Sequence, residues 1–241
     1  MTLAFIDAPS PNFEPRAKPP WMIVLHYTGM QTGEAALAQL RSEAAKVSSH
    51  YMVEEDGRIF RLVDEERRAW HAGRSSWRGE SDVNTASVGI EIVNPGHEWG
   101  YRPFPEPQIA AVIDLVANIR TRWLIADRDI VGHSDVAPSR KTDPGEFFPW
   151  KRLSEAGHGL WVEPPPAPGA PIGEGEEGAA VFAFQAGLTR LGYLCPPTGT
   201  FDAATADVVR AFQRHWRQEK VDGIADGETR ARLIALLKVA D

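Results

Sequence analysis

Cysteine is almost absent from this 241-residue sequence, in which Cys195 is the only one. A single thiol excludes a disulfide within the chain and a zinc site built from several cysteines. Positive charge is also scarce, because 26 lysines and arginines stand against 33 aspartates and glutamates, for a net charge of -7. No run of lysine or arginine compensates for this, so a nucleic acid is not an expected partner.

Long apolar runs are missing as well. No stretch approaches the roughly 18 uncharged apolar residues of a membrane-spanning helix, and the segment AAVIDLVANIR is interrupted by Asp114 and Asn118. The first residues, MTLAFIDAPSPNFEP, lack a basic start and a long apolar centre, so they do not resemble a secretory signal. We expect a protein with no membrane span, located in the cytoplasm, or in the periplasm if a leader is missing from this sequence.

Residues 162–178, VEPPPAPGAPIGEGEEG, are rich in proline, glycine and glutamate and contain almost no large apolar side chain. Such a segment cannot form a hydrophobic core and favours extended conformations. We interpret it as a linker between a domain at residues 1–161 and a smaller domain at residues 179–241.

The first domain alternates strand-like and helix-like segments. Apolar or alternating runs predict strands at residues 21–28, 86–94 and 128–133, and a hairpin at residues 50–63 turns at Asp56-Gly57. Amphipathic patterns predict helices at residues 33–45 and 105–123. The order of these elements indicates an α/β fold, with a mixed central sheet flanked by helices.

The second domain is predicted to be all-helical, with three helices. Val208, Phe212 and Trp216 are spaced along one face of the middle helix. Asp202 and Asp226 each stand where a side chain can cap the helix that follows.

Two histidines and one aspartate predict a metal site. His26 and His133 each end a strongly apolar strand segment, and Asp143 follows His133 by ten residues in the proline-broken stretch VGHSDVAPSRKTDPG. Two imidazoles and one carboxylate suit Zn²⁺ and leave a fourth position for water, as in catalytic sites. A histidine at a strand end can also be purely structural, and spacing does not exclude that alternative.

Glu91 and Lys141 are the further candidates for catalysis. Glu91 lies in the apolar run SVGIEIVN, where a carboxylate is costly unless it is paired or used in a reaction. An edge-strand glutamate facing solvent is the alternative. Lys141 stands in the same loop as Asp143, where a lysine is often only solvated. His50 and His71 either line a cleft or form local hydrogen bonds.

The motifs together resemble a known family. The segments VLHYT, SSHYMV, DGRIFRLV, AWHAG, NTASVGIEIVN and GHSDVAPSRKTDPG, spread over roughly residues 20–152, are similar to zinc-dependent N-acetylmuramoyl-L-alanine amidases of the amidase-2 type. That family shares its fold with peptidoglycan recognition proteins. In the second domain, PPTGTFDAATADVVRAFQ and VDGIADGETRARL resemble a three-helix peptidoglycan-binding module.

The resemblance assigns a role to each candidate residue. His26, His133 and Asp143 match the zinc ligands, Glu91 matches the catalytic acid/base, and Lys141 matches the residue that stabilises the reacting oxyanion. It implies hydrolysis of the amide between N-acetylmuramic acid and L-alanine in peptidoglycan or its muropeptide fragments. We expect a monomer whose C-terminal module is separable and contributes substrate affinity rather than chemistry. Whether that module binds the cell wall or packs on the catalytic domain stays open.

Three other functions compete with this one. A non-catalytic peptidoglycan-recognition protein would lack the complete zinc triad, a related zinc enzyme would cut another wall bond, and a structural anchor would depend on the C-terminal module. The sequence leaves open whether anhydro-muropeptides or intact peptidoglycan are preferred. Zinc content and turnover of a muropeptide distinguish the three alternatives.

Overall fold

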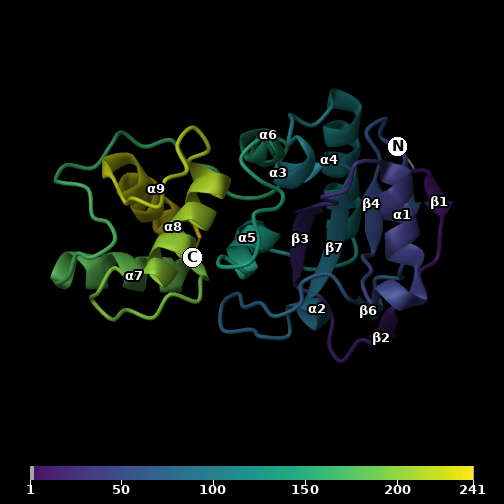
Figure 1. Cartoon of the computed structure of the whole chain (residues 1–241), viewed down its shortest axis with the longest axis horizontal. Helices are drawn as coiled ribbons and strands as arrows, with labels where there is room; N and C mark the ends of the chain where they lie inside the picture. Colours follow the sequence, from purple (N-terminus) through teal and green to yellow (C-terminus); the bar gives the residue numbers. More distant parts are fainter. Residues whose placement is uncertain (1–2, 241) are drawn as a thin grey trace.

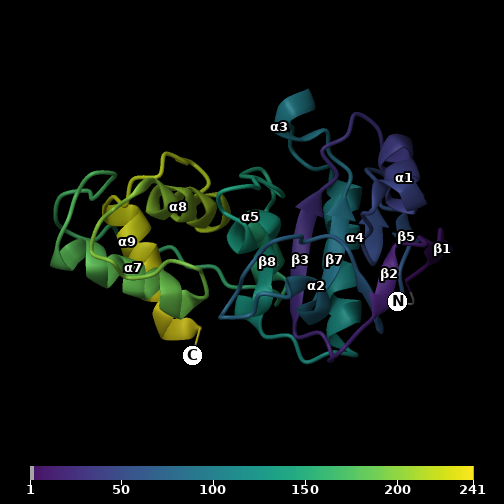
Figure 2. The ribbon, with the colours of Figure 1, turned by 60° about the horizontal axis from the view of Figure 1, so that its bottom comes forward.

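The computed structural model of the protein describes residues 3–240 and is centred on a six-stranded mixed sheet (Figures 1 and 2). The strands are ordered β1-β5-β4-β7-β3-β8, and a separate antiparallel pair is formed by β2 and β6. Their bounds are β1 (Phe5–Asp7), β2 (Phe13–Pro15), β3 (Met22–Tyr27), β4 (Tyr51–Val53), β5 (Ile59–Arg61), β6 (Arg67–Ala69), β7 (Ser87–Ile92) and β8 (Ile130–Gly132). The predicted α/β fold with a mixed sheet is confirmed.

The two faces of the sheet have different roles. Successive side chains of a strand point to opposite faces, and in β3 the residues Ile23 and Leu25 pack in one hydrophobic cluster with helix α4 (Glu106–Arg120). Met22 and Val24 belong to another cluster on the opposite face. His26 follows them in the same alternation, so it is presented on the face that α4 does not cover.

The remaining helices of the first domain are shorter. They are α1 (Gly33–Arg41), α2 (Val83–Ala86), α3 (Gly96–Trp99), α5 (His133–Val136) and α6 (Trp150–Glu155), with 3-10 turns at Glu43–Ala45 and Asp127–Asp129. The helix predicted at residues 33–45 therefore ends earlier, at Arg41. The predicted hairpin is confirmed, since β4 and β5 pair antiparallel and Gly57 turns with a φ of +88° that favours glycine.

The strand predicted at residues 128–133 is too long by two residues at its start, which belong to the 3-10 turn, and by one at its end. β8 ends at Gly132, and His133 is the first residue of α5. The reason is a capping interaction, in which the Asp135 carboxylate accepts a hydrogen bond from the Gly132 backbone N–H at 2.7 Å. This bond starts a helical turn where the apolar pattern alone suggests a continuing strand.

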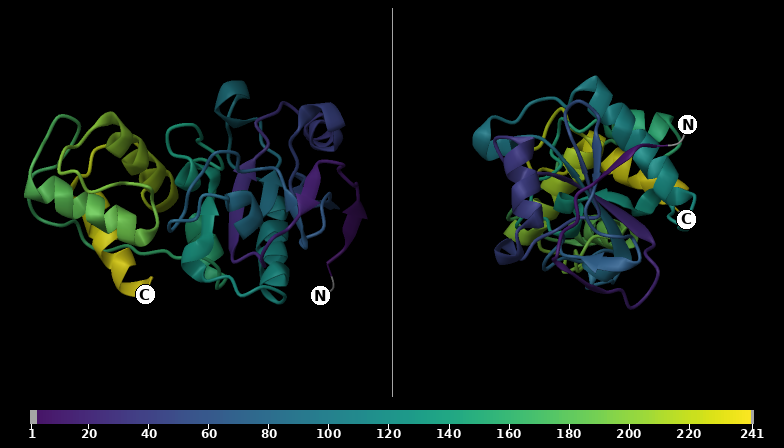
Figure 3. Two further views of the ribbon diagram at one scale, coloured as in Figure 1. Left: turned by 90° about the horizontal axis from the view of Figure 1, so that it is seen from below. Right: turned by 90° about the vertical axis from the view of Figure 1, so that its right-hand side faces the viewer.

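The C-terminal domain is formed by α7 (Ala179–Leu191), α8 (Ala203–Trp216) and α9 (Gly227–Val239), which lie together at one end of the molecule (Figure 3). The two predicted caps are confirmed, because Asp202 and Asp226 accept hydrogen bonds from the N–H groups three residues later. Among residues 3–240, no helix is both long and apolar enough to cross a membrane.

The helical domain is not separate from the first. One hydrophobic cluster runs from β3 and β8 through Trp77 into all three C-terminal helices, and α8 packs against α5. The segment 162–178 is also attached, because Ala167 N–H donates to Gly227 O at 2.8 Å and Ile172 pairs with Ala225. The segment expected as a linker therefore contacts the helical domain, and the helical domain packs on the first, which proline-rich composition does not report. That the helical domain is separable stays a prediction.

Candidate metal centre and active site

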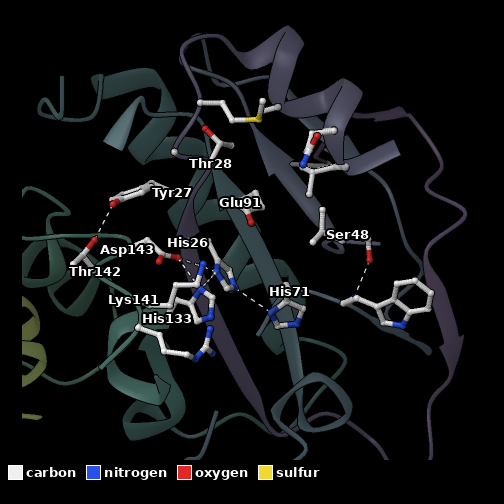
Figure 4. A pocket seen from close by; sticks show the side chains of 18 residues that line it. His26, Tyr27, Thr28, Ser48, His71, Glu91, His133, Lys141, Thr142 and Asp143 are labelled. Atoms are coloured by element: carbon white, nitrogen blue, oxygen red, sulfur yellow. Dashed lines mark hydrogen bonds and ion pairs between the residues drawn. The ribbon is translucent and has the colours of Figure 1, made fainter. Parts of the chain in front are cut away.

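Three side chains from separate segments converge at the carboxyl ends of neighbouring strands (Figure 4). β3 and β8 are parallel with Leu25 opposite Gly132, so the residues that follow, His26 and His133, are neighbours. Their Nδ1 atoms lie 2.9 Å apart, and each lies 3.0 Å from Asp143 Oδ2. All three residues are buried. This cluster can hold a metal ion.

The far side of each imidazole prepares Nδ1 to be a metal ligand. His133 Nε2 lies 3.1 Å from the Ala72 carbonyl oxygen, which can only accept, so Nε2 carries the hydrogen and Nδ1 keeps its lone pair. A hydrogen bond from the second nitrogen to a carbonyl or carboxylate is the usual way in which a protein orients a metal-bound histidine.

A longer hydrogen-bond chain stands behind His26. His26 Nε2 lies 3.0 Å from His71 Nδ1, His71 Nε2 lies 3.2 Å from Ser87 Oγ, and Ser87 Oγ donates to the Val83 carbonyl at 2.6 Å. The Val83 carbonyl can only accept, so the Ser87 hydroxyl donates to it and accepts from His71 Nε2–H. His71 Nδ1 then accepts from His26 Nε2–H, and His26 Nδ1 carries a lone pair and no hydrogen. The His71 ring lies directly against Gly89, where a Cβ atom would be 2.5 Å from His71 Cγ.

The charges also suit a metal. Burial, followed by repulsion from His133, lowers the pKa of His26 to about 4, so the ring is neutral at physiological pH. Burial alone would raise the pKa of Asp143, but its interactions with His133 and His26 outweigh burial and lower that pKa below its ordinary value. A neutral imidazole at His26 and an ionised carboxylate at Asp143 are protonation states that suit binding of a divalent metal.

Glu91 lies beside the metal cluster. It is the Cα partner of His26 in the parallel β3–β7 pair, and it lines the same cavity. Its Oε2 atom is buried and has no hydrogen-bond partner within residues 3–240. Burial first, and then the negative charge of Asp143, raise the pKa of Glu91 well above its ordinary value. A buried carboxyl group beside a metal cluster, with a pKa raised in this way, is a candidate for proton transfer.

Lys141 completes the set predicted from the sequence. It is partly exposed at the wall of the cavity, two residues before Asp143. Its ammonium group makes no hydrogen bond or ion pair with another described residue of the chain, so it is available to a bound molecule. The structure thus brings all five predicted residues to one cavity (Figure 4).

The cavity is open and has a volume of about 520 Å³, which suits a small ligand. Besides the five predicted residues, its walls include Gln39, Ser48, Trp70, His71 and Arg140. Of His50 and His71, for which the sequence allows either a place in a cleft or local hydrogen bonds, His71 lines the cavity. His50 is structural, because its Nδ1 accepts a hydrogen bond from the Gly89 N–H at 2.9 Å.

Comparisons with known proteins agree with this geometry. Residues 16–146 match the N-acetylmuramoyl-L-alanine amidase family, and residues 177–233 match a putative peptidoglycan-binding domain. The N-acetylmuramoyl-L-alanine amidase AmiD of Escherichia coli is 36% identical over 93% of this chain and 83% of its own length. A putative amidase of Rickettsia conorii is 30% identical over 82% of this chain and 75% of its own.

Solved structures extend the likeness to three dimensions. The complex of E. coli AmiD with the substrate anhydro-N-acetylmuramic acid-L-Ala-D-gamma-Glu-L-Lys has a TM-score of 0.78 and 35% identity, covering 92% of this chain and 90% of that one. AMPDH3 of Pseudomonas aeruginosa with anhydromuramic pentapeptide has a TM-score of 0.76 and 33% identity, covering 92% and 93%. The chain belongs to the N-acetylmuramoyl-L-alanine amidase family, as an enzyme that hydrolyses the amide between N-acetylmuramic acid and L-alanine and carries a peptidoglycan-binding domain.

Proposed function

We propose that His26, His133 and Asp143 hold one Zn²⁺ ion. Two imidazoles and a carboxylate form a known catalytic zinc set with a fourth position left open. The hydrogen bonds behind both imidazoles support the proposal, because they leave the two Nδ1 lone pairs free toward Asp143. Bound there, Zn²⁺ would polarise the amide carbonyl and lower the pKa of water to about 7.

Glu91 is the proposed general base and acid. It would take a proton from the attacking water and deliver it to the nitrogen of the leaving L-alanine, a contribution typically of about 10²- to 10⁴-fold in rate. The observation that carries this role is the Oε2 atom, which is buried in the cavity that holds the metal cluster and has no hydrogen-bond partner among the described residues. An unpaired buried carboxylate is costly to a fold, so its presence favours a function.

Lys141 is proposed to stabilise the negative oxygen that develops when water adds to the amide carbonyl. Its ammonium group has no competing partner among the described residues, and it lies in the loop that carries Asp143. A preorganised charge at this point is commonly worth about 10²- to 10³-fold in rate. Removing Lys141 is expected to be less severe than removing Glu91.

The decisive test exchanges Glu91 for glutamine, which keeps the shape and removes the ionisable oxygen. Glu91→Gln is expected to retain zinc and the fold while losing turnover of a soluble muramoyl peptide by about 10²-fold or more. Glu65→Gln is the control, because Glu65 is also a buried carboxylate but is paired with Arg122 outside the cavity. Near-normal turnover by zinc-loaded Glu91→Gln would remove Glu91 from the mechanism.

For the substrate, we propose small muramoyl peptides with a 1,6-anhydro sugar. The related AmiD and AMPDH3 structures contain anhydromuramic peptides, and a cavity of about 520 Å³ is suited to a fragment. Offering the purified enzyme anhydro-muropeptides and intact peptidoglycan, with products identified by mass, tests the preference. Faster release of peptide from intact peptidoglycan than from anhydro-muropeptides would contradict the proposed preference.

The monomeric state and the cytoplasmic location expected from the sequence remain proposals. Light scattering across a range of protein concentrations tests the first, because a dimer would double the measured mass. Cell fractionation of the native protein tests the second.

A further inference from the structure

A buried polar cluster joins the helical domain to the turn that carries His133. The Asp135 side chain is 0% exposed, and its two oxygens accept three hydrogen bonds. Tyr193 Oη donates to Oδ1 at 2.5 Å, while His215 Nδ1, at 2.7 Å, and the Gly132 N–H, at 2.7 Å, donate to Oδ2. We call Asp135, Tyr193 and His215 the Asp135 cluster. It lies outside the cavity, so substrate does not reach it.

Aromatic packing allows little movement within the Asp135 cluster. The His215 ring is stacked between Trp150 and Trp216, with ring centroids 3.6 Å away on each side. The Tyr193 ring meets the edge of Trp77 at 5.1 Å. Close-packed rings are poorly compressible, so a shift of one ring displaces the rings that it contacts. The carboxylate of Asp135 is therefore held from the side of the helical domain, as well as by its own turn.

Asp135 in turn holds the segment that presents His133. Its bond to the Gly132 N–H closes the turn in which His133 is the next residue. The same turn is tied to the third ligand, because the Ser134 N–H donates to the Asp143 backbone oxygen at 2.9 Å. The positions of two ligands thus depend on this turn.

A second contact reaches the loop after Asp143. Gln218, just beyond the end of α8, donates through Nε2 to the carbonyl oxygens of Glu146 and Phe148, the latter at 2.7 Å. His215 in α8 thus contacts the turn that carries His133, and Gln218 contacts the loop that follows Asp143.

We infer that the helical domain sets the geometry of the metal centre, with Tyr193, His215 and Gln218 as positioning residues for His133 and Asp143. The inference rests on the metal site proposed above and adds to it a dependence on the peptidoglycan-binding domain. Removing one contact lets the ligand turn relax, which weakens metal binding. Partners outside the ligand set typically change metal affinity by about 10- to 100-fold.

The test compares two tyrosine hydroxyls in the same protein. Tyr193→Phe removes the bond to Asp135 and keeps the ring, while Tyr51→Phe removes an equivalent buried bond, from Tyr51 Oη to Glu65 Oε1 at 2.8 Å, away from the ligands. The dissociation constant for Zn²⁺ is measured on the full chain by competition with a chromophoric chelator. We expect it to rise about tenfold for Tyr193→Phe and to stay within about twofold for Tyr51→Phe, and thermal unfolding verifies that both are folded.

Zinc binding by folded Tyr193→Phe that stays within about twofold of the unchanged protein overturns the inference. If Tyr193→Phe does not fold, Gln218→Ala replaces it, because that variant removes only the contact to the loop after Asp143. A dissociation constant for Zn²⁺ that rises about tenfold then supports the inference, and one within about twofold overturns it. The zinc titration contains no substrate. An absence of amidase turnover would therefore refute the proposed chemistry without affecting the comparison of the Zn²⁺ dissociation constants. Excess Zn²⁺ should restore the turnover of Tyr193→Phe, which a loss of folding alone would not allow.

Discussion

Glu91 stands directly opposite His26 in the parallel pairing of β7 with β3. Backbone hydrogen bonds therefore set the spacing between the proposed acid/base and the first metal ligand. A slip of one residue in this pairing would turn Glu91 toward the hydrophobic cluster under α4. The apolar neighbours Ile90 and Ile92 prevent the slip, because they are fully buried on that other face. The reactive carboxyl is thus positioned by the core of the sheet.

The first prediction uses the pKa of Glu91, which burial and Asp143 raise well above its ordinary value. A carboxyl pKa that is higher in the folded state means that ionisation destabilises the fold as pH rises through that pKa. Glu91→Gln cannot ionise, so the zinc-free variant should have a larger free energy of unfolding than the unchanged protein at about pH 8, and an equal one near pH 4. Urea denaturation at both pH values measures this. A gain in stability that grows toward acid pH would contradict the assignment.

The second prediction concerns metal content. Protein purified without added metal should contain about one zinc per chain, and His133→Ala should contain less than about a tenth of that because a three-ligand site then has two ligands. His158→Ala is the matched control, since His158 contacts Arg120 away from the cluster. Elemental analysis of all three proteins gives the answer. Equal zinc in His133→Ala and the unchanged protein would exclude this site.

The third prediction concerns Lys141. Lys141→Ala should lower kcat by about 10²-fold while KM changes little, because the ammonium acts on charge that appears only in the transition state. Lys151→Ala removes another lysine, one that pairs with Glu163 on the surface, and should leave kcat unchanged. Steady-state kinetics on a soluble muramoyl peptide separates the two constants. A rise in KM with normal kcat would instead make Lys141 a substrate-binding residue.

The fourth prediction tests the chain behind His26. Gly89→Ala would place a Cβ atom 2.5 Å from His71 Cγ, so the ring must move and the His26–His71 contact is lost. Zinc affinity should then fall by about 10- to 100-fold. Gly173→Ala is the control, because its nearest contact would be an ordinary 3.9 Å. Chelator competition measures both variants, and unchanged affinity in folded Gly89→Ala would show that His71 does not orient the ligand.

Local pattern was sufficient for the long elements and for placing His26 and His133 near the carboxyl ends of β3 and β8, although the bounds of β8 differ from those predicted. Apolar runs place β3, β7 and α4, and polar residues at strand ends single out His26 and His133. The three-residue strands β1, β2 and β6 are too short to show a period. His71 stayed ambiguous because its role depends on hydrogen bonds with His26 and Ser87 rather than on its own neighbours in the sequence.

The docking of the helical domain lies beyond sequence patterns for a similar reason. Asp135 meets Tyr193 and His215 across separations of 58 and 80 residues. In sequence, Asp135 is a polar residue in a loop, and His215 is a polar residue near the end of an amphipathic helix. Only the folded chain shows that Asp135 accepts hydrogen bonds from Tyr193 and His215 in a buried interface.

The last prediction is that a chain ending at Val162 does not keep the properties of the first domain. Without the helices, apolar side chains that are now fully buried, among them Trp77, Val131 and Val136, lose part of their cover. Each such side chain contributes about 1.5–3 kcal/mol when it is fully buried, against a total stability of about 5–15 kcal/mol for a typical domain. The shortened protein should therefore unfold at a clearly lower temperature, bind zinc more weakly and lose turnover even on small soluble muropeptides. Calorimetry, zinc titration and kinetics on the two chain lengths measure these effects. A shortened protein with unchanged unfolding temperature and unchanged turnover on the small substrate would show that the two domains act independently, as the composition of residues 162–178 alone suggests.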